Sequence, residues 1–181
     1  MKKYFSYLIL FLMAIVSSGC IYSPAVQQLN KIAAQYMENG DTNSAISRLE
    51  SSVDLDGNIY ESRYNLAVAY IKVSKCKEAL EQIAKAQELA PEEPALYYIL
   101  GLSNKCLANQ INDKIKSNNE KNKKTDFEFK ERMVLLDDYV KYLQDANMGF
   151  EKYLELAPNT DETQEITRII IENKELIEAQ K

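Results

Sequence analysis

A pattern of apolar residues in the stretch 60–93 constrains the fold of this chain more than any other feature of its sequence. These residues recur at the spacing of two antiparallel amphipathic helices. The first helical face consists of Arg63, Leu66, Ala67 and Tyr70, and the second of Ala79, Ile83, Ala86 and Ala90. A small residue on each helix, Ala67 and Ala79, lets the backbones approach closely, while larger residues such as Leu89 fill the space around the contact. Pro91 ends the second helix, because the residue before a proline disfavours helical backbone.

Two further copies of this pattern flank the first. Aligning Ala67 with Ala33 recovers the pattern on the N-terminal side as Ile32, Ala33, Tyr36, Ala45, Leu49 and Leu55, with Gly57 in place of the proline. The same shift in the other direction aligns Ala67 with Gly101 and recovers Tyr97, Tyr98 and Leu100. The third copy then breaks off and resumes only at Ala146, Phe150, Leu156, Ala157 and Pro158. An insertion therefore splits the third unit. We expect helices over 24–38, 42–56, 59–73 and 76–90 in the first two units.

The period of about 34 residues and the order of small and large side chains resemble the tetratricopeptide repeat (TPR) family over 26–107 and 144–158. This resemblance implies an all-α fold, a right-handed α-solenoid of about three helix-turn-helix repeats within a domain at 24–181. The repeats would span 26–59, 60–93 and 94–158, with the insertion at about 108–143. A capping helix would follow at 160–180, with Ile166, Ile169, Ile170, Leu176 and Ile177 on its apolar side.

The insertion has a polar part and an apolar part. Residues 117–125 contain few apolar side chains and predict a mobile, protease-sensitive loop. The following helix carries a heptad seam at Phe129, Met133, Leu136, Val140, Leu143, Asn147, Phe150, Leu154 and Ala157. This seam fits a lengthened helical hairpin that packs on itself. The alternative is a helix whose N-terminal part, 127–143, projects as a second binding surface.

The first twenty residues have the pattern of a secretory signal. Lys2 and Lys3 precede an apolar run, and Ser18 and Gly19 precede Cys20. This ending resembles a bacterial lipobox, which implies a signal peptide at 1–19, a lipidated Cys20 and a short tether at 20–23. The alternatives are an uncleaved apolar anchor or a coincidental cysteine. No aspartate follows the cysteine, which in the enterobacterial pattern favours the outer membrane, at its periplasmic face.

Composition excludes several functions. The chain has no His and no Trp, which removes imidazole bases, His metal ligands and Ser-His or Cys-His pairs. Without Lys2 and Lys3, the 22 basic residues fall to 20 against 27 acidic ones, and such an acidic chain does not suit nucleic acid. The Asp and Glu residues fall at helix starts and on polar faces. We therefore expect no enzymatic activity, no metal and no cofactor.

The family resemblance implies a concave groove lined by the first helix of each repeat. The residues expected in this groove are Met37, Tyr64, Val68, Ile71, Lys72, Tyr98, Leu102 and Lys105. Each of these can instead pack neighbouring helices together. Tyr64 and Tyr98 occupy equivalent positions of neighbouring repeats, and we expect them to anchor a protein segment. Lys72 and Lys105 would favour an acidic segment.

One subclass of the family grips a peptide carboxylate with a row of Lys and Asn residues. The matching positions here are Asn30, Ala34, Asn65, Ala95 and Ile99. Only the two asparagines fit, so we do not expect such a carboxylate clamp.

Two cysteines remain once Cys20 is acylated. Antiparallel packing would bring Cys76, at the start of a helix, close to Cys106, near the end of the next one. They form a disulfide or stay as two separate thiols. A Cα separation beyond about 7 Å would rule the bond out.

Two functional hypotheses follow. The first is a membrane-anchored scaffold that binds protein partners of the bacterial cell envelope in its groove. The second is a structural envelope lipoprotein without a specific client. Repeat scaffolds bind many kinds of partner, so the fold alone does not choose between them.

Overall fold

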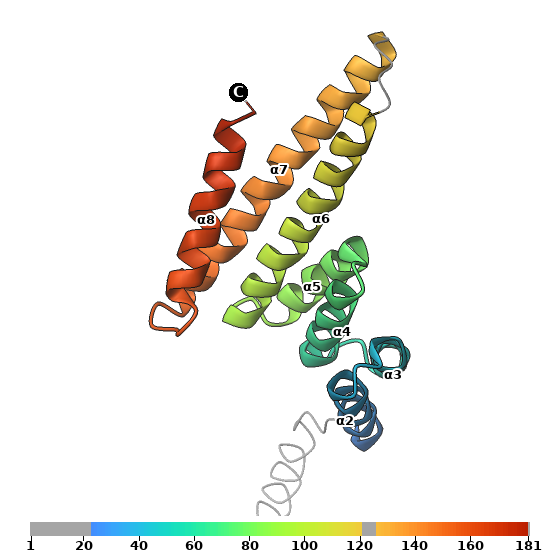
Figure 1. Ribbon diagram of the computed structural model, residues 1–181. Helices are drawn as coiled ribbons and strands as arrows, with labels where there is room; N and C mark the ends of the chain where they lie inside the picture. Colours follow the sequence, from blue (N-terminus) through green and yellow to red (C-terminus); the bar gives the residue numbers. More distant parts are fainter. Residues whose placement is uncertain (1–22, 121–125, 181) are drawn as a thin grey trace, which may run out of the picture.

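The computed structural model describes residues 23–120 and 126–180, and within these ranges it contains only helices and connecting turns (Figure 1). The helices are α2 (Pro24–Glu38), α3 (Thr42–Leu55), α4 (Tyr60–Lys72), α5 (Cys76–Leu89), α6 (Pro94–Glu120), α7 (Asp126–Leu156) and α8 (Thr163–Glu178). The all-α prediction is confirmed. The four helices predicted in the first two units agree with α2 to α5 to within one residue at each end.

The core between α4 and α5 follows the predicted pattern of small and large side chains. Ala67 and Ala79 are fully buried, and Leu66 and Ile83 fill the space beside them. The prediction for Leu89 is wrong, because its side chain is 41% exposed. Leu89 is the last residue of α5 and lies to the side of the buried face that Cys76, Ala79, Ile83 and Ala86 form.

Two glycines set the closest approach of α6 and α7. A Cβ atom added to Gly149 would lie 2.8 Å from the backbone nitrogen of Gly101, which is too close for two non-bonded atoms. A Cβ added to Gly101 would meet the ring of Phe150 at 2.6 Å. The two helices therefore touch backbone to backbone at this point, and the Phe150 ring packs directly on Gly101.

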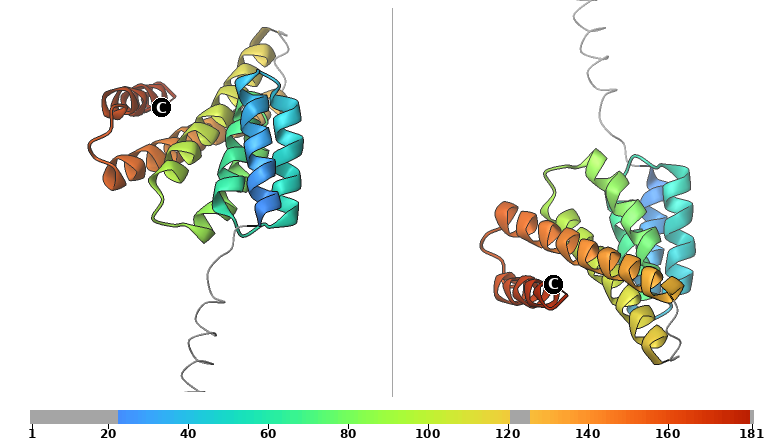
Figure 2. Two further views of the ribbon diagram at one scale, coloured as in Figure 1. Left: turned by 90° about the horizontal axis from the view of Figure 1, so that it is seen from below. Right: turned by 90° about the horizontal axis from the view of Figure 1, so that it is seen from above.

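The insertion lengthens α6 and α7 into one long hairpin, which extends past the other helices in every view (Figures 1 and 2). A separate apolar cluster of Ala108, Ile111, Ile115, Tyr139 and Leu143 holds its two arms together. The hairpin thus packs on itself over this length, as the first of the two predicted alternatives requires.

Two details of the predicted insertion are wrong. Residues 117–120 are helical, because α6 continues through Glu120 instead of ending in a polar loop. The rest of the predicted loop, 121–125, lies outside the described residues. Phe129 and Met133, predicted as seam positions, are 66% and 44% exposed. They lie at the start of α7, where the apolar side chains of the hairpin cluster have ended.

The hairpin is tied to the second repeat by a disulfide between Cys76 and Cys106, whose Cα atoms are 5.8 Å apart. This separation lies within the range that a disulfide requires. One turn further along α6, the Gln110 side chain donates a 2.7 Å hydrogen bond to the carbonyl oxygen of Ser74. These two links fix α6 to the turn that precedes α5.

Among residues 23–120 and 126–180, no helix combines the length and apolar character that crossing a membrane requires.

Candidate partner-binding surface

We call the eight predicted groove residues the first-helix face. Met37 lies in α2, Tyr64, Val68, Ile71 and Lys72 in α4, and Tyr98, Leu102 and Lys105 in α6. The apolar and aromatic members are all half-buried and pack against the main core, whereas Lys72 is exposed. These side chains therefore stabilise the stack of helices with one side and leave the other side open to a partner.

The position of the first repeat that is equivalent to Tyr64 is occupied by Asn30, which is part of a closed polar network. Its amide nitrogen lies 3.0 Å from the hydroxyl of Ser52 and 2.8 Å from that of Ser62, and these two buried hydroxyls are 3.0 Å apart. The same nitrogen also donates to the carbonyl oxygen of Val26, and the Asn65 amide donates to the Asn30 side-chain oxygen at 3.4 Å. Both asparagines that match the carboxylate clamp are thus engaged within the fold.

Tyr64 and Tyr98 lie on the same surface together with a third tyrosine, Tyr153 of α7. The ring centroids of Tyr98 and Tyr153 are 5.4 Å apart, and those of Tyr98 and Phe150 are 6.0 Å apart. Tyr64 packs against the same core as Tyr98, and, in addition to the effect of burial, ionisation of one tyrosine opposes that of its neighbours and raises the pKa of Tyr64 and Tyr98. We call Tyr64, Tyr98 and Tyr153 the tyrosine cluster.

Burial raises the pKa of the Tyr64 and Tyr98 hydroxyls above its ordinary value, and nearby acidic groups raise it further. The acidic neighbours are Glu93 for Tyr64, and Glu165 and Glu162 for Tyr98. Both phenols are therefore neutral hydrogen-bonding groups at physiological pH. The charge beside the tyrosines is negative, in contrast to the positive character that the sequence analysis expected from Lys72 and Lys105.

The last helix, α8, continues this surface. Ile169 packs in one cluster with Tyr98, Leu102 and Tyr153, and the Tyr153 hydroxyl donates a 3.2 Å hydrogen bond to the carboxylate of Glu162. Ile166 and Ile170, on the adjacent side of α8, are buried in one cluster with Ala146 and Phe150 of α7. Of the residues predicted on the apolar side of this helix, Leu176 is 43% exposed.

Solved structures, among them TPR domains, superpose on this chain. The first TPR domain of Spaghetti (RPAP3), bound to the HSP90 peptide SRMEEVD, gives a TM-score of 0.62 at 18% identity and covers 87% of this chain and 98% of that one. The Sgt2 TPR domain from Aspergillus fumigatus gives 0.61 at 17% identity, covering 86% and 81%. The Yersinia enterocolitica chaperone SycD, in complex with a peptide of the translocator YopD, gives 0.58 at 15% identity, covering 90% and 98%.

The chain has the TPR fold. The likeness to these structures confirms the predicted helical-repeat architecture at low sequence identity. No family model matches the sequence, and no curated protein matches it.

Within the TPR fold, Tyr153 occupies a position that is small in the other two repeats. The equivalent residues are Ser52 and Ala86, both fully buried. The first helices α2, α4 and α6 approach one another, but no Cα atom of α6 lies within 8 Å of a Cα atom of α8 in the described part of the chain. Tyr153 thus places a large ring at the junction where the helices are farther apart, and small side chains lie at the junctions where they approach.

Sequence reasoning missed Tyr153 as a surface residue because it lies on a second helix, which the repeat pattern assigns to the side away from the groove. The alignment of the repeats nevertheless shows that Tyr153 departs from the residues at its equivalent positions. A tyrosine where two repeats have serine and alanine cannot be accommodated in the same closed contact.

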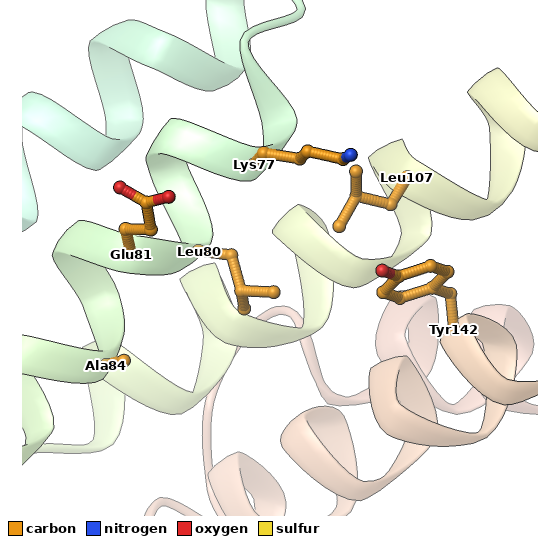
Figure 3. Close-up of a pocket in the computed structure, with 6 residues that line it drawn as sticks. All are labelled: Lys77, Leu80, Glu81, Ala84, Leu107 and Tyr142. Carbon is orange, nitrogen blue, oxygen red and sulfur yellow. The ribbon is translucent and has the colours of Figure 1, made fainter. Parts of the chain in front are cut away.

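A small pocket lies between α5 and the long hairpin (Figure 3). Its volume is about 310 Å³, and its lining residues are Lys77, Leu80, Glu81, Ala84, Leu107 and Tyr142. Two of these directly follow the cysteines of the disulfide. The pocket is open to solvent and mainly apolar, and it shares no residue with the tyrosine cluster.

No group of three or more Cys, Asp or Glu side chains in the described ranges is arranged to hold a metal ion. The predicted lipidation site, Cys20, lies outside the described residues.

Proposed function

We propose that this chain is a membrane-anchored scaffold of the bacterial cell envelope that binds a segment of a protein partner on its first-helix face. The gathering of Tyr64, Tyr98 and Tyr153 on one side of the repeats carries this proposal. Tyrosine rings bury a large apolar area with little loss of side-chain entropy, and their hydroxyls can bond to the backbone of a partner.

The structural neighbours support protein binding as the general activity. Two of them are TPR domains in complex with HSP90 and HSP70 peptides, and a third is the chaperone SycD in complex with a peptide of YopD. In the present chain the partner would use the second and third repeats, because the first repeat closes the equivalent position with the hydrogen bonds of Asn30.

The membrane anchor in this proposal is an acylated Cys20, left at the N-terminus after cleavage of 1–19. The disulfide between Cys76 and Cys106 supports an oxidising compartment such as the periplasm. An outer-membrane location at the periplasmic face fits both features. Mass spectrometry of the mature protein tests the anchor, and finding an unmodified Cys20 in membrane-derived material would contradict it.

Affinity capture of the full chain from solubilised envelopes tests partner binding. Wild-type protein should recover one partner or complex in stoichiometric amount, whereas Tyr64→Ala should lose most of it at an equal folded fraction. Replacing a partner-contacting tyrosine by alanine costs about 2 kcal/mol of binding free energy or more. Tyr142→Ala removes a half-buried tyrosine on the hairpin, away from the tyrosine cluster, and should retain the partner.

Two outcomes of this capture experiment would contradict the proposal. Recovery of the chain alone would support the alternative of a structural lipoprotein without a specific client. Loss of the partner with Tyr142→Ala and not with Tyr64→Ala would move the binding site away from the first-helix face.

The projecting hairpin is a second candidate surface. Phe129, Met133 and Val134 are exposed near the start of α7, beyond the apolar cluster that holds the hairpin together. Three exposed apolar side chains in this short stretch are typical of a contact site. Capture that depends on Phe129 and not on Tyr64 would favour this site.

A further inference from the structure

The side of α8 that faces the tyrosine cluster carries a regular stripe of acidic and apolar residues. Its members are separated by alternating steps of three and four positions, which places them on one helical face: Glu162, Glu165, Ile169, Glu172 and Leu176. The stripe begins beside the tyrosines, because Ile169 packs in the same cluster as Tyr98 and Glu162 accepts the hydrogen bond from Tyr153.

Much of this stripe remains accessible. Leu176 is 43% exposed, and Glu165 is exposed one turn before Ile169. Figure 1 shows α8 beside α7 and apart from α6, in agreement with the absence of Cα atoms within 8 Å between α6 and α8 in the described ranges. The backbone of α6 therefore lies away from α8 in the described ranges, and only side chains of α6 such as Tyr98 and Leu102 reach the cluster that contains Ile169.

The charges nearest the tyrosines are negative. Glu93 acts on Tyr64, and Glu162 and Glu165 act on Tyr98. The cations of the same face, Lys72 and Lys105, lie about two helical turns beyond Tyr64 and Tyr98 along α4 and α6.

One carboxylate of the stripe, that of Glu172, has a cationic partner. Arg168 pairs with Glu172 at 3.8 Å, which reduces the charge in the middle of α8. Among the described residues, Glu162 and Glu165 at the start of α8 and Glu93 in the turn before α6 have no ion pair.

We propose that the partner segment on this surface is basic. One Lys or Arg side chain of the segment would contact the rings of Tyr98 and Tyr153 on one side and the carboxylates of Glu162 and Glu165 on the other. An apolar residue of the same segment would cover Leu176. A cation is attracted both to the face of an aromatic ring and to a carboxylate, and an acidic segment would be repelled. The inference rests on the proposed function and specifies the chemistry of its partner.

A phage-displayed library of random peptides, each about a dozen amino acids long, tests this chemistry even though the partner is unidentified. Selection is carried out on three forms of the full chain: wild type, Glu162→Lys/Glu165→Lys, and Tyr64→Ala. A fourth form, Glu88→Lys/Glu131→Lys, changes the net charge equally at two exposed positions on α5 and α7, outside the acidic stripe of α8.

Peptides that need Tyr64 for binding should be enriched in Lys and Arg on the wild-type protein. Those peptides should bind about tenfold more weakly to Glu162→Lys/Glu165→Lys, the change expected for two reversed surface contacts. Their affinity for Glu88→Lys/Glu131→Lys should stay within about twofold of wild type at physiological salt, because distant charges are screened.

The outcomes separate this inference from the function on which it rests. Tyr64-dependent peptides that are acidic, or that show no charge preference, would overturn the basic-segment inference and leave the scaffold function standing. Peptides that bind equally well to the wild type and to Tyr64→Ala would contradict binding on the first-helix face itself. Equal weakening by both double variants would show that net charge, and not the tyrosine cluster, selects the peptide.

Discussion

The junction between the first two repeats and the junction between the third repeat and α8 place different chemistry at equivalent positions. In the first junction Asn30, Ser52 and Ser62 are small polar residues joined by hydrogen bonds of 2.8 to 3.0 Å. In the second, Tyr98 and Tyr153 are large aromatic residues with ring centroids 5.4 Å apart. In the first arrangement the polar groups bond to one another. In the second, the following helix α8 lies farther from α6, and rings and hydroxyls remain accessible.

This difference shows that a repeat can keep its helices while changing what its surface offers. The polar junction satisfies its own donors and acceptors, so that little remains for a partner. The aromatic junction is stabilised by packing with one side of each ring. A substitution at the polar junction of the first repeat should therefore lower stability without weakening binding. A substitution at the aromatic junction of the third repeat should affect both.

The largest effect is expected for Phe150→Ala in the aromatic junction. Phe150 is fully buried, packs on Gly101 and Tyr98, and joins α6, α7 and α8 in one cluster. Its truncation should lower the free energy of unfolding by about 3 to 5 kcal/mol, measured by urea denaturation. A loss below about 1 kcal/mol would mean that the ring does not support this junction.

The next largest effect is expected at the junction between α5 and α6, which has a covalent link. The Cys76–Cys106 disulfide closes a loop with a sequence separation of 30 residues. Cys76→Ser/Cys106→Ser should lower stability by about 3 to 4 kcal/mol on the chain-entropy model. Thiol titration of the unfolded wild-type protein provides the control, since two titratable thiols at these positions would show that no bridge forms.

A smaller effect is expected for Asn30→Ala in the polar junction. The substitution leaves the buried hydroxyls of Ser52 and Ser62 without their amide donor, which costs about 1 to 3 kcal/mol. Partner capture by the folded protein should be unchanged, in contrast to Tyr64→Ala. Loss of capture without loss of stability would show that the first repeat contributes to binding.

The smallest effect concerns pH. Burial raises the pKa of Tyr64 and Tyr98, so the folded chain holds these two protons at a pH where the unfolded chain releases them. Their contribution to stability is fully present below the ordinary pKa of 10.0 and is lost as pH rises above it. Urea denaturation as a function of pH should show this fall, and Tyr64→Phe/Tyr98→Phe should reduce it.

The sequence predicted the repeats better than the surface they form. Spacing alone located α2 to α5, because the positions of Ala67, Ala79 and Ile83 depend on helix period and on contacts within one repeat. The accessibility of Leu176 depends on how far α8 lies from α6, which no local pattern states. The same limit applies to the end of α6, where a polar composition indicated a loop and the helix continues to Glu120.

The candidate site was partly predictable for the same reason. The repeat period placed Tyr64 and Tyr98 on one face, where they lie together. The carboxylates beside them come from the turn before α6 and from the start of α8, which lie outside the repeat positions that the tyrosines occupy. Whether these carboxylates make the surface around the tyrosines negative depends on tertiary packing. In the sequence, Lys72 and Lys105 alone suggested a positive surface.

We expect a partner to bind at the aromatic end of the repeat array and not at the polar end. A photo-crosslinking amino acid placed in intact cells at Glu165 of α8, or at Ala34 of α2, reports directly on which end is occupied, because both positions are exposed. Glu88 of α5, also exposed, serves as the background control. The account predicts a defined crosslinked partner from Glu165 and only background from Ala34, whereas a partner that crosslinks to Ala34 and not to Glu165 would contradict it.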